Sequence, residues 1–158
     1  MRLCLLALLV GACDGPPAVV GHALTLMSVS AEGAAVPLLE GQDVTLVAGA
    51  QGGFHVWLRY AYDGAPVADA TLTRTAHRVS DDALVLRSTA ETTVDALSDP
   101  LPMFMCPSPV GIGVIDTPIT YSLELTDGRG ADLASGTITL VPRCPADEAA
   151  FCQQICTG

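Results

Sequence analysis

Three side chains that could bind a ligand occupy alternate positions in one short stretch: His55, Trp57 and Arg59. An indole ring can stack on a sugar or anchor a partner protein, and a nearby guanidinium adds charge and hydrogen-bond donors. Residues two apart in a β-strand share a face, so these three form a candidate binding face. Two alternatives bury Trp57: a β-bulge that shifts the register, or a C-terminal tail that covers the face.

The sequence shows little else that indicates catalysis. A catalytic triad requires a nucleophile, a base and an orienting acid that converge, and no serine lies in a Gly-x-Ser-x-Gly motif. Asp127 and Asp132 flank a glycine-rich turn, but they lack the spacing of a calcium-binding loop. We therefore expect no catalytic residue, no metal and no cofactor. A small envelope hydrolase built on His55 or His77 with two acids is the more distant alternative.

Four cysteines in the last third of the chain predict two disulfides, because an even number in an exported domain indicates pairing. They are Cys106, Cys144, Cys152 and Cys156. Pro145 and the acids after it predict a short helix, which would place Cys152 and Cys156 one turn apart, further than a disulfide prefers. Each should pair elsewhere, and we favour Cys144–Cys156 and Cys106–Cys152. A zinc site would need a nearby histidine or a Cys-x-x-Cys pair, and neither is present.

The first thirteen residues have the features of an export signal. Arg2 is followed by an apolar run over residues 3–10, too short to span a bilayer, and then by small residues. The run Leu9-Val10-Gly11-Ala12-Cys13 resembles the lipobox of bacterial lipoproteins. This resemblance implies a signal peptide over residues 1–12, a lipid on Cys13 and anchoring at the outer membrane or the periplasmic face of the inner membrane. The alternative is an ordinary Cys13 after a secretory signal, and a secreted protein.

Charge restricts the partners. The chain has 158 residues and a formal charge of −10, and all its basic residues are arginine. Such an acidic surface repels phosphate backbones, so we expect no nucleic-acid partner. The absence of lysine excludes a P-loop lysine and Schiff-base chemistry. The expected partners are the membrane, through the N-terminal lipid, and an envelope protein or polysaccharide.

The element that positions the candidate face is a predicted central strand over residues 54–62. Its other side alternates apolar and aromatic side chains, and glycine-containing turns precede and follow it. These inward residues are Phe54, Val56, Leu58, Tyr60 and Tyr62.

The rest of the chain predicts one all-β domain over residues 23–143, after a tether at 13–22 and before a cysteine-rich tail at 144–158. We expect a proline-rich irregular segment at 97–109. Seven to eight antiparallel strands with regular turns favour a β-sandwich. Besides 54–62, the expected strands are 23–29, 36–39, 43–48, 69–79, 83–87, 118–126 and 135–141.

Two stretches carry a resemblance to known families. The run Ile119-Thr-Tyr-Ser-Leu-Glu-Leu-Thr-Asp-Gly-Arg-Gly, followed by Ser135-Gly-Thr-Ile-Thr-Leu-Val, is similar to the last hairpin of bacterial immunoglobulin-like and fibronectin-III-like domains. It implies an immunoglobulin-like sandwich with Ile119, Tyr121, Leu123 and Leu125 facing the core, although the antibody-type cysteine pair is absent. The run Gln51-Gly-Gly-Phe-His-Val-Trp resembles uncharacterised lipoproteins of myxobacteria, which implies lineage and location but no activity.

Overall fold

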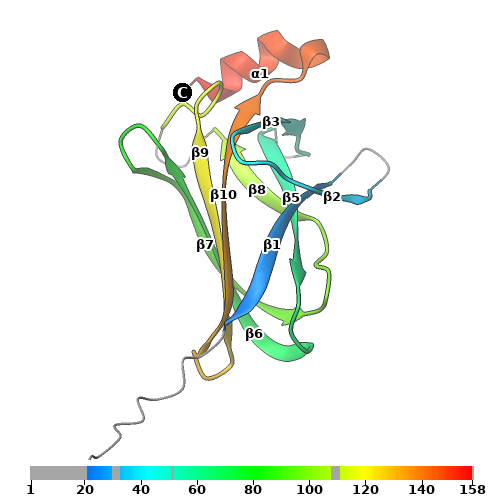
Figure 1. The fold of residues 1–158 in the computed structure, drawn as a ribbon. Helices are drawn as coiled ribbons and strands as arrows, with labels where there is room; N and C mark the ends of the chain where they lie inside the picture. Colours follow the sequence, from blue (N-terminus) through cyan, green and yellow to red (C-terminus); the bar gives the residue numbers. More distant parts are fainter. Residues whose placement is uncertain (1–20, 30–32, 51, 108–110, 158) are drawn as a thin grey trace, which may run out of the picture.

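The computed structural model describes residues 21–29, 33–50, 52–107 and 111–157, and in this part every element before the C-terminal tail is a β-strand (Figure 1). The all-β prediction is confirmed. The predicted signal peptide at 1–12, Cys13 and the predicted tether up to residue 20 lie outside the described residues. The strands are β1 (His22–Val29), β2 (Ala35–Pro37), β3 (Gln42–Thr45), β4 (Val47–Ala48), β5 (Phe54–Tyr62), β6 (Val67–Arg78), β7 (Ala83–Val94), β8 (Leu101–Cys106), β9 (Ile119–Asp127) and β10 (Asp132–Arg143).

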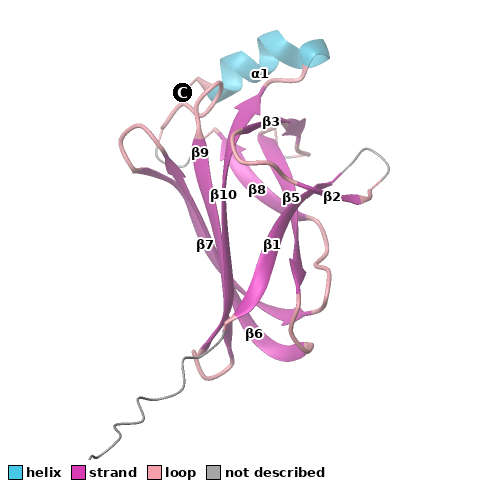
Figure 2. Ribbon diagram, viewed as in Figure 1, coloured by secondary structure: helices cyan, strands magenta, loops and turns pink. Residues whose placement is uncertain are grey.

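The strands form one curled, mixed sheet with two halves that enclose the core (Figure 2). One half contains β8, β5 and β1, with β2 and β4 at its margin. The other half runs in the order β3, β10, β9, β6, β7. Both β1 and β3 pair with β10 in parallel, whereas every other pair is antiparallel. The sequence pattern predicts antiparallel strands only. The two parallel pairs show that the sheet is mixed.

Strand β1 joins the two halves, because it changes partner along its length. His22 and Ala23 pair with β10, and the residues from Leu24 to Ser28 pair with β5. This crossing brings the Leu24 carbonyl against Gly136 of β10, where a Cβ atom would collide with it. A glycine at this position allows the close backbone approach that the exchange of partners requires.

The core is filled by the inward side of the alternating strands. All five inward residues of β5 are buried, and so are Ile119, Tyr121, Leu123 and Leu125 of β9, as predicted. The outward Glu124 is exposed. Burying side chains of this size stabilises the fold by about 1.5–3 kcal/mol each, so the two alternating strands account for much of the core.

Three expectations about strands need correction. Residues 101–106, expected to be irregular, form β8; its ladder partner is β5 alone, and proline is tolerated in an edge strand. Strand β7 continues to Val94 because its second half pairs with the first half of β6. The single strand expected at 43–48 is divided into β3 and β4 by Leu46, which is fully buried.

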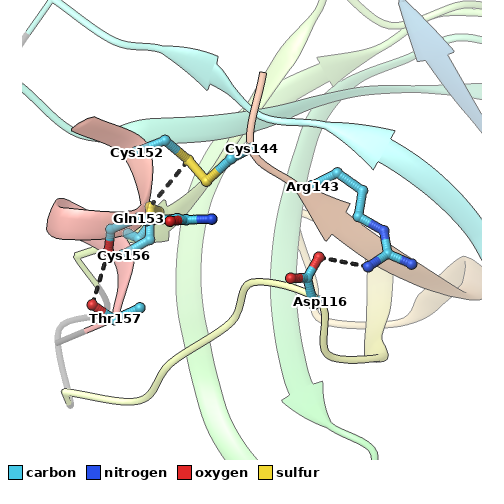
Figure 3. The surroundings of a disulfide bond; sticks show 8 residues. Asp116, Arg143, Cys144, Cys152, Gln153, Cys156 and Thr157 are labelled. Atoms are coloured by element: carbon cyan, nitrogen blue, oxygen red, sulfur yellow. Dashed lines mark hydrogen bonds and ion pairs between the residues drawn. A yellow bond between two sulfur atoms is a disulfide. The ribbon is translucent and has the colours of Figure 1, made fainter. Parts of the chain in front are cut away.

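The tail forms the short helix that the sequence predicted, a 3-10 turn (Ala146–Glu148) followed by α1 (Ala149–Cys156). The prediction of two disulfides is confirmed, but the favoured pairing is wrong: the bonds are Cys106–Cys156 and Cys144–Cys152 (Figure 3). Because the α-helix starts only at Ala149, the chain has already turned back, and the Cα atoms of Cys144 and Cys152 lie 5.7 Å apart. Cys156, one turn later, then faces β8.

The disulfides indicate an oxidising compartment outside the cytoplasm. Among the described residues no helix has the length and apolar character needed to cross a membrane. Strand β1 begins at His22, so the last residue assigned to the tether already belongs to the sheet.

Candidate functional site

The outer side of β5 carries the three candidate residues, and Trp57 is the most exposed of them. The indole is 37% exposed, so both interpretations that bury Trp57 are wrong. The irregularity in the β5–β8 pairing lies between Phe54 and His55, before Trp57 is reached. The helical tail contacts only the start of the strand, where the rings of Phe151 and Phe54 are 5.8 Å apart. The outward direction of His55, Trp57 and Arg59 is therefore confirmed.

The residues that flank this side of β5 are apolar or uncharged. Val47 is 49% exposed and Leu97 is 43% exposed, which is high for aliphatic side chains. None of the residues paired with the four outward positions of β5 is acidic, although the chain has 17 acidic residues. The partners whose side chains the structure describes are Val47 beside His55, Pro102 beside Trp57, Met27 beside Arg59, and Thr25 and Leu97 beside Ala61. We call the outward residues of β5 and these partners the β5 face.

A groove of about 730 Å³ opens beside Trp57. It lies where β5 lacks a registered neighbour on one edge, since the pairing with β4 ends at His55 and that with β1 begins at Leu58. Polar residues are among those that line it, including Ser28, Gln42 and Thr45. A volume of this size is typical of small-molecule sites.

One acid, Asp43, also lines the groove. Its carboxylate lies 3.0 Å from a guanidinium nitrogen of Arg143, which also contacts Asp116 (Figure 3). The two carboxylates raise the pKa of Arg143. Because one guanidinium is shared by two carboxylates, the group of Asp43, Asp116 and Arg143 keeps one net negative charge, and Asp43 brings an ion-paired carboxylate to the groove.

His55 supports Trp57 by packing. Its imidazole lies so close to Gly49 that a Cβ atom at position 49 would overlap it, and its centroid is 6.3 Å from that of the indole. Burial lowers the pKa of His55, so the ring is neutral at pH 7. The turn that brings Gly49 under the ring is closed by a hydrogen bond from the Gly49 N–H to the Gly53 carbonyl.

Arg59 differs from the other arginines near the β5 face. Its Nε atom is buried and makes no hydrogen bond. The ion pairs among the described residues involve Arg78 and Arg143 but not Arg59. A buried guanidinium nitrogen without an acceptor costs free energy. Because Nε is buried, a ligand on this face could reach only the terminal nitrogens of the half-buried Arg59.

The other two histidines are held in separate places. His22 lies 3.4 Å from Asp63 and has an edge-on contact with Tyr62. His77 lies 3.2 Å from Asp82 at the β6–β7 turn. The structure thus does not gather the histidines into one site. In the described part of the chain no three metal-ligating side chains cluster together.

The outer face of the opposite half is polar and contrasts with the β5 face. Hydroxyl pairs connect neighbouring strands there: Thr73–Thr89, Thr120–Thr139 and Ser122–Thr137, at 3.1 to 3.4 Å. Exposed Glu91, Glu124 and Arg87 stand among them. Threonine is favoured on the solvated side of a sheet, so this face needs no ligand to explain it.

Two polar residues inside the fold were not singled out from the sequence. Arg74 stands in the inward register of β6, between the buried Leu72 and Ala76, and donates to the Ser88 hydroxyl and to the Pro102 carbonyl of the other half. The sequence does contain a sign of this role, because Arg74 is a charged residue between the apolar inward positions Leu72 and Ala76 of β6. Ser98 is 8% exposed, and its hydroxyl accepts a hydrogen bond from the backbone of β5. No local sequence pattern predicts this role.

In comparisons with known proteins, no protein-family model and no curated protein matches the chain.

Proposed function

We propose that this chain is a lipid-anchored protein of the bacterial cell envelope whose single immunoglobulin-like domain binds a glycan or a protein without catalysis. The lipobox resemblance at Cys13 supports the anchor. The two disulfides agree with an exported domain.

The strand pairing supports the immunoglobulin-like assignment. An antiparallel group of β8, β5 and β1 faces a second group of β10, β9, β6 and β7. When the short strands β2, β3 and β4 are set aside, this division into three and four strands agrees with the proposed immunoglobulin-like sandwich. The first part of the chain connects the two groups, because β1 and β3 both pair in parallel with β10.

The observation that carries the binding role is the exposed Trp57 on an acid-free face beside the groove. Aromatic, methionine and arginine side chains are enriched at the centre of interaction surfaces, whereas acids are depleted there. Trp57, Met27 and Arg59 fit this composition. No comparable observation favours the hydrolase alternative, since the described histidines lie apart.

The arrangement also suits a tethered protein. The start of β1, where the proposed tether ends, lies at the end of the molecule opposite α1 (Figure 1). The groove is lined by Gly33 and by residues of β3 and β4, which lie toward the α1 end. A lipid at Cys13 would therefore hold the His22 end toward the membrane and leave the groove open to the envelope space.

The anchor is tested by the intact mass of the protein purified from native membranes. We expect the mass of residues 13–158 plus acyl chains, increasing by four hydrogens on reduction of the two disulfides. A mass without acyl chains would contradict the lipid anchor and favour a secreted protein.

Binding is tested through Trp57, which is the only tryptophan and therefore the only indole reporter. We expect its fluorescence to change on titration with a soluble envelope polysaccharide or protein, and calorimetry to show that Trp57→Ala abolishes the binding. The matched control is Leu84→Ala, which removes a side chain of similar exposure, 40%, from β7 in the other half. Equal binding by both variants would refute a site at Trp57.

A further inference from the structure

The charge distribution of the β5 face restricts the chemistry of its ligand. The chain as a whole carries −10, yet the one formal charge on this face is the guanidinium of Arg59, which has neither ion pair nor hydrogen bond with the described residues. Because Nε is buried, a ligand carboxylate would be held by the two terminal nitrogens of the guanidinium, which can donate two parallel hydrogen bonds to it.

Resting on the proposed binding role, we infer that the β5 face recognises a glycan with an isolated carboxylate, that is, a uronic acid residue within an otherwise neutral chain. Arg59 would hold the carboxylate, and the ring would stack on Trp57. The two residues share one face of β5 two positions apart, about 7 Å along the strand, which fits a sugar ring and the carboxylate attached to it.

The neighbouring groove favours a sugar chain over a peptide. Ser28, Gln42 and Thr45 line it. The Ser28 hydroxyl already donates to the Val36 carbonyl and the Gln42 amide oxygen already accepts from the Leu39 N–H, so sugar hydroxyls would bind to the remaining capacity: the acceptor side of Ser28, the amide NH₂ of Gln42 and the hydroxyl of Thr45. The acidic remainder of the molecule limits the charge density of the ligand, because a net charge of −10 repels a polyanion. The preferred ligand therefore carries one carboxylate among neutral sugars.

Three oligosaccharides of similar length test this inference by calorimetry against the full mature protein. Xylotetraose is neutral, xylotriose with one glucuronic acid branch has one carboxylate, and tetragalacturonate has four. We expect the branched oligosaccharide to bind about tenfold or more tightly than xylotetraose, as hydrogen bonds to a charged group allow. Tetragalacturonate should bind more weakly than the branched one at low salt, and the difference should shrink as salt screens the repulsion.

Two substitutions at one position separate charge from geometry. Arg59→Gln should remove the preference for the branched oligosaccharide, so that the ratio of its affinity to that of xylotetraose falls to about one. Arg59→Lys should keep only part of the preference, because an ammonium group cannot form the two parallel bonds. Arg87→Gln is the matched control, since it removes the same charge from the opposite face and should change nothing. Arg59 has no hydrogen bond to lose, so the melting temperature should stay near that of the wild type.

The outcomes separate this inference from the broader proposal. Equal binding of xylotetraose and the branched oligosaccharide, or a preference that survives Arg59→Gln, would overturn the carboxylate assignment while a glycan site at Trp57 remains. If a carboxylate-bearing peptide bound and none of the three sugars did, the inference of a glycan ligand would be wrong and the ligand would be a protein. Failure of every sugar and peptide to change Trp57 fluorescence would contradict the binding role itself.

Discussion

At the scale of single residues, Ser98 shows how a central strand obtains hydrogen bonds where its sheet neighbour is missing. The Tyr60 N–H donates to the Ser98 hydroxyl at 3.0 Å, the Ser98 N–H donates to the Tyr60 carbonyl, and the hydroxyl donates to the Asp99 carbonyl. The serine thus replaces a strand partner just before β8 begins.

We predict that Ser98→Ala lowers the free energy of unfolding by about 1–3 kcal/mol, because it leaves the buried Tyr60 N–H without an acceptor. Urea denaturation measures the change. Ser135→Ala, on the exposed side of β10, should stay within about 0.5 kcal/mol of the wild type. If both variants were equally stable, the role assigned to Ser98 would be wrong.

Gly136 is a second single residue on which the fold depends. We predict that Gly136→Ala destabilises the domain by about 1–3 kcal/mol or more, because the new methyl group meets the Leu24 carbonyl, which is backbone and cannot rotate away. Thermal melting should show the loss. The control is Gly113→Ala, where a Cβ atom meets nothing within 4 Å; a similar loss there would show a general effect of removing glycine.

Much of the residue scale could be predicted from the sequence. The alternation of β5 and β9 gives the buried and outward residues, because a period of two is a local property of an extended chain. Trp57 could be placed on the outer side for the same reason, but its exposure could not be predicted, since a covering tail is a matter of tertiary structure. The roles of Ser98 and of the Gly136 crossing arise from contacts between distant segments.

At the scale of elements, the tail and the sheet are joined by two loops of very different length. The separation is 50 residues for Cys106–Cys156 and 8 residues for Cys144–Cys152. Closing a longer loop removes more entropy from the unfolded chain.

We therefore predict that replacing Cys106 and Cys156 by alanine costs more than replacing Cys144 and Cys152. The chain-entropy relation gives losses of about 4 and about 2.5 kcal/mol for the two loops. Urea denaturation of the two double variants, compared with the wild type, measures both. The reverse order would show that contacts of the buried sulfur atoms, and not loop entropy, set the contribution.

The hairpin of β6 and β7 has its own pH dependence. Two hydrogen bonds from Arg78 lower the pKa of Asp81 from 3.8 to about 2. Since the folded pKa is below the unfolded one, the stabilisation is complete above about pH 4 and is lost as pH falls towards 2.

We predict that Asp81→Asn destabilises the domain slightly at pH 7, and that its difference from the wild type disappears near pH 2. Unfolding measured across this range checks the trend. Asp69→Asn is the control, because Asp69 has no ion pair among the described residues. If the stability of Asp69→Asn differed from that of the wild type with the same dependence on pH, the Arg78–Asp81 pair would not be the cause.

The elements were less predictable than the residues. Strands rich in alternating apolar residues were found, whereas β8 was missed because its prolines suggested an irregular segment, and prolines are compatible with an edge. The disulfide pairing was wrong because the position at which a helix starts decides which cysteines meet. The parallel pairs with β10 lie far apart in sequence and leave no local signal.

At the scale of the whole molecule, acidic residues outnumber basic ones and give the chain a formal charge of −10, while the described residues paired with the outward positions of β5 include no acid. The sequence isoelectric point is about 4.3, and the net charge keeps copies apart at pH 7. We predict a solubility minimum near pH 4.3, measured by light scattering across pH 3 to 7. Added salt at pH 7 should leave the protein monodisperse; aggregation there would mean that the apolar β5 face, and not charge, controls self-association.

The disulfide connectivity also has a consequence for biogenesis. One bond is nested inside the other: Cys144–Cys152 joins cysteines that are consecutive in the order of the chain, and Cys106–Cys156 encloses them. During export from the N-terminus, Cys106 and Cys144 emerge first, and an oxidant acting at once would join them wrongly. Both native bonds use cysteines of the last seven residues, so oxidation can finish correctly only after nearly the whole chain has been translocated.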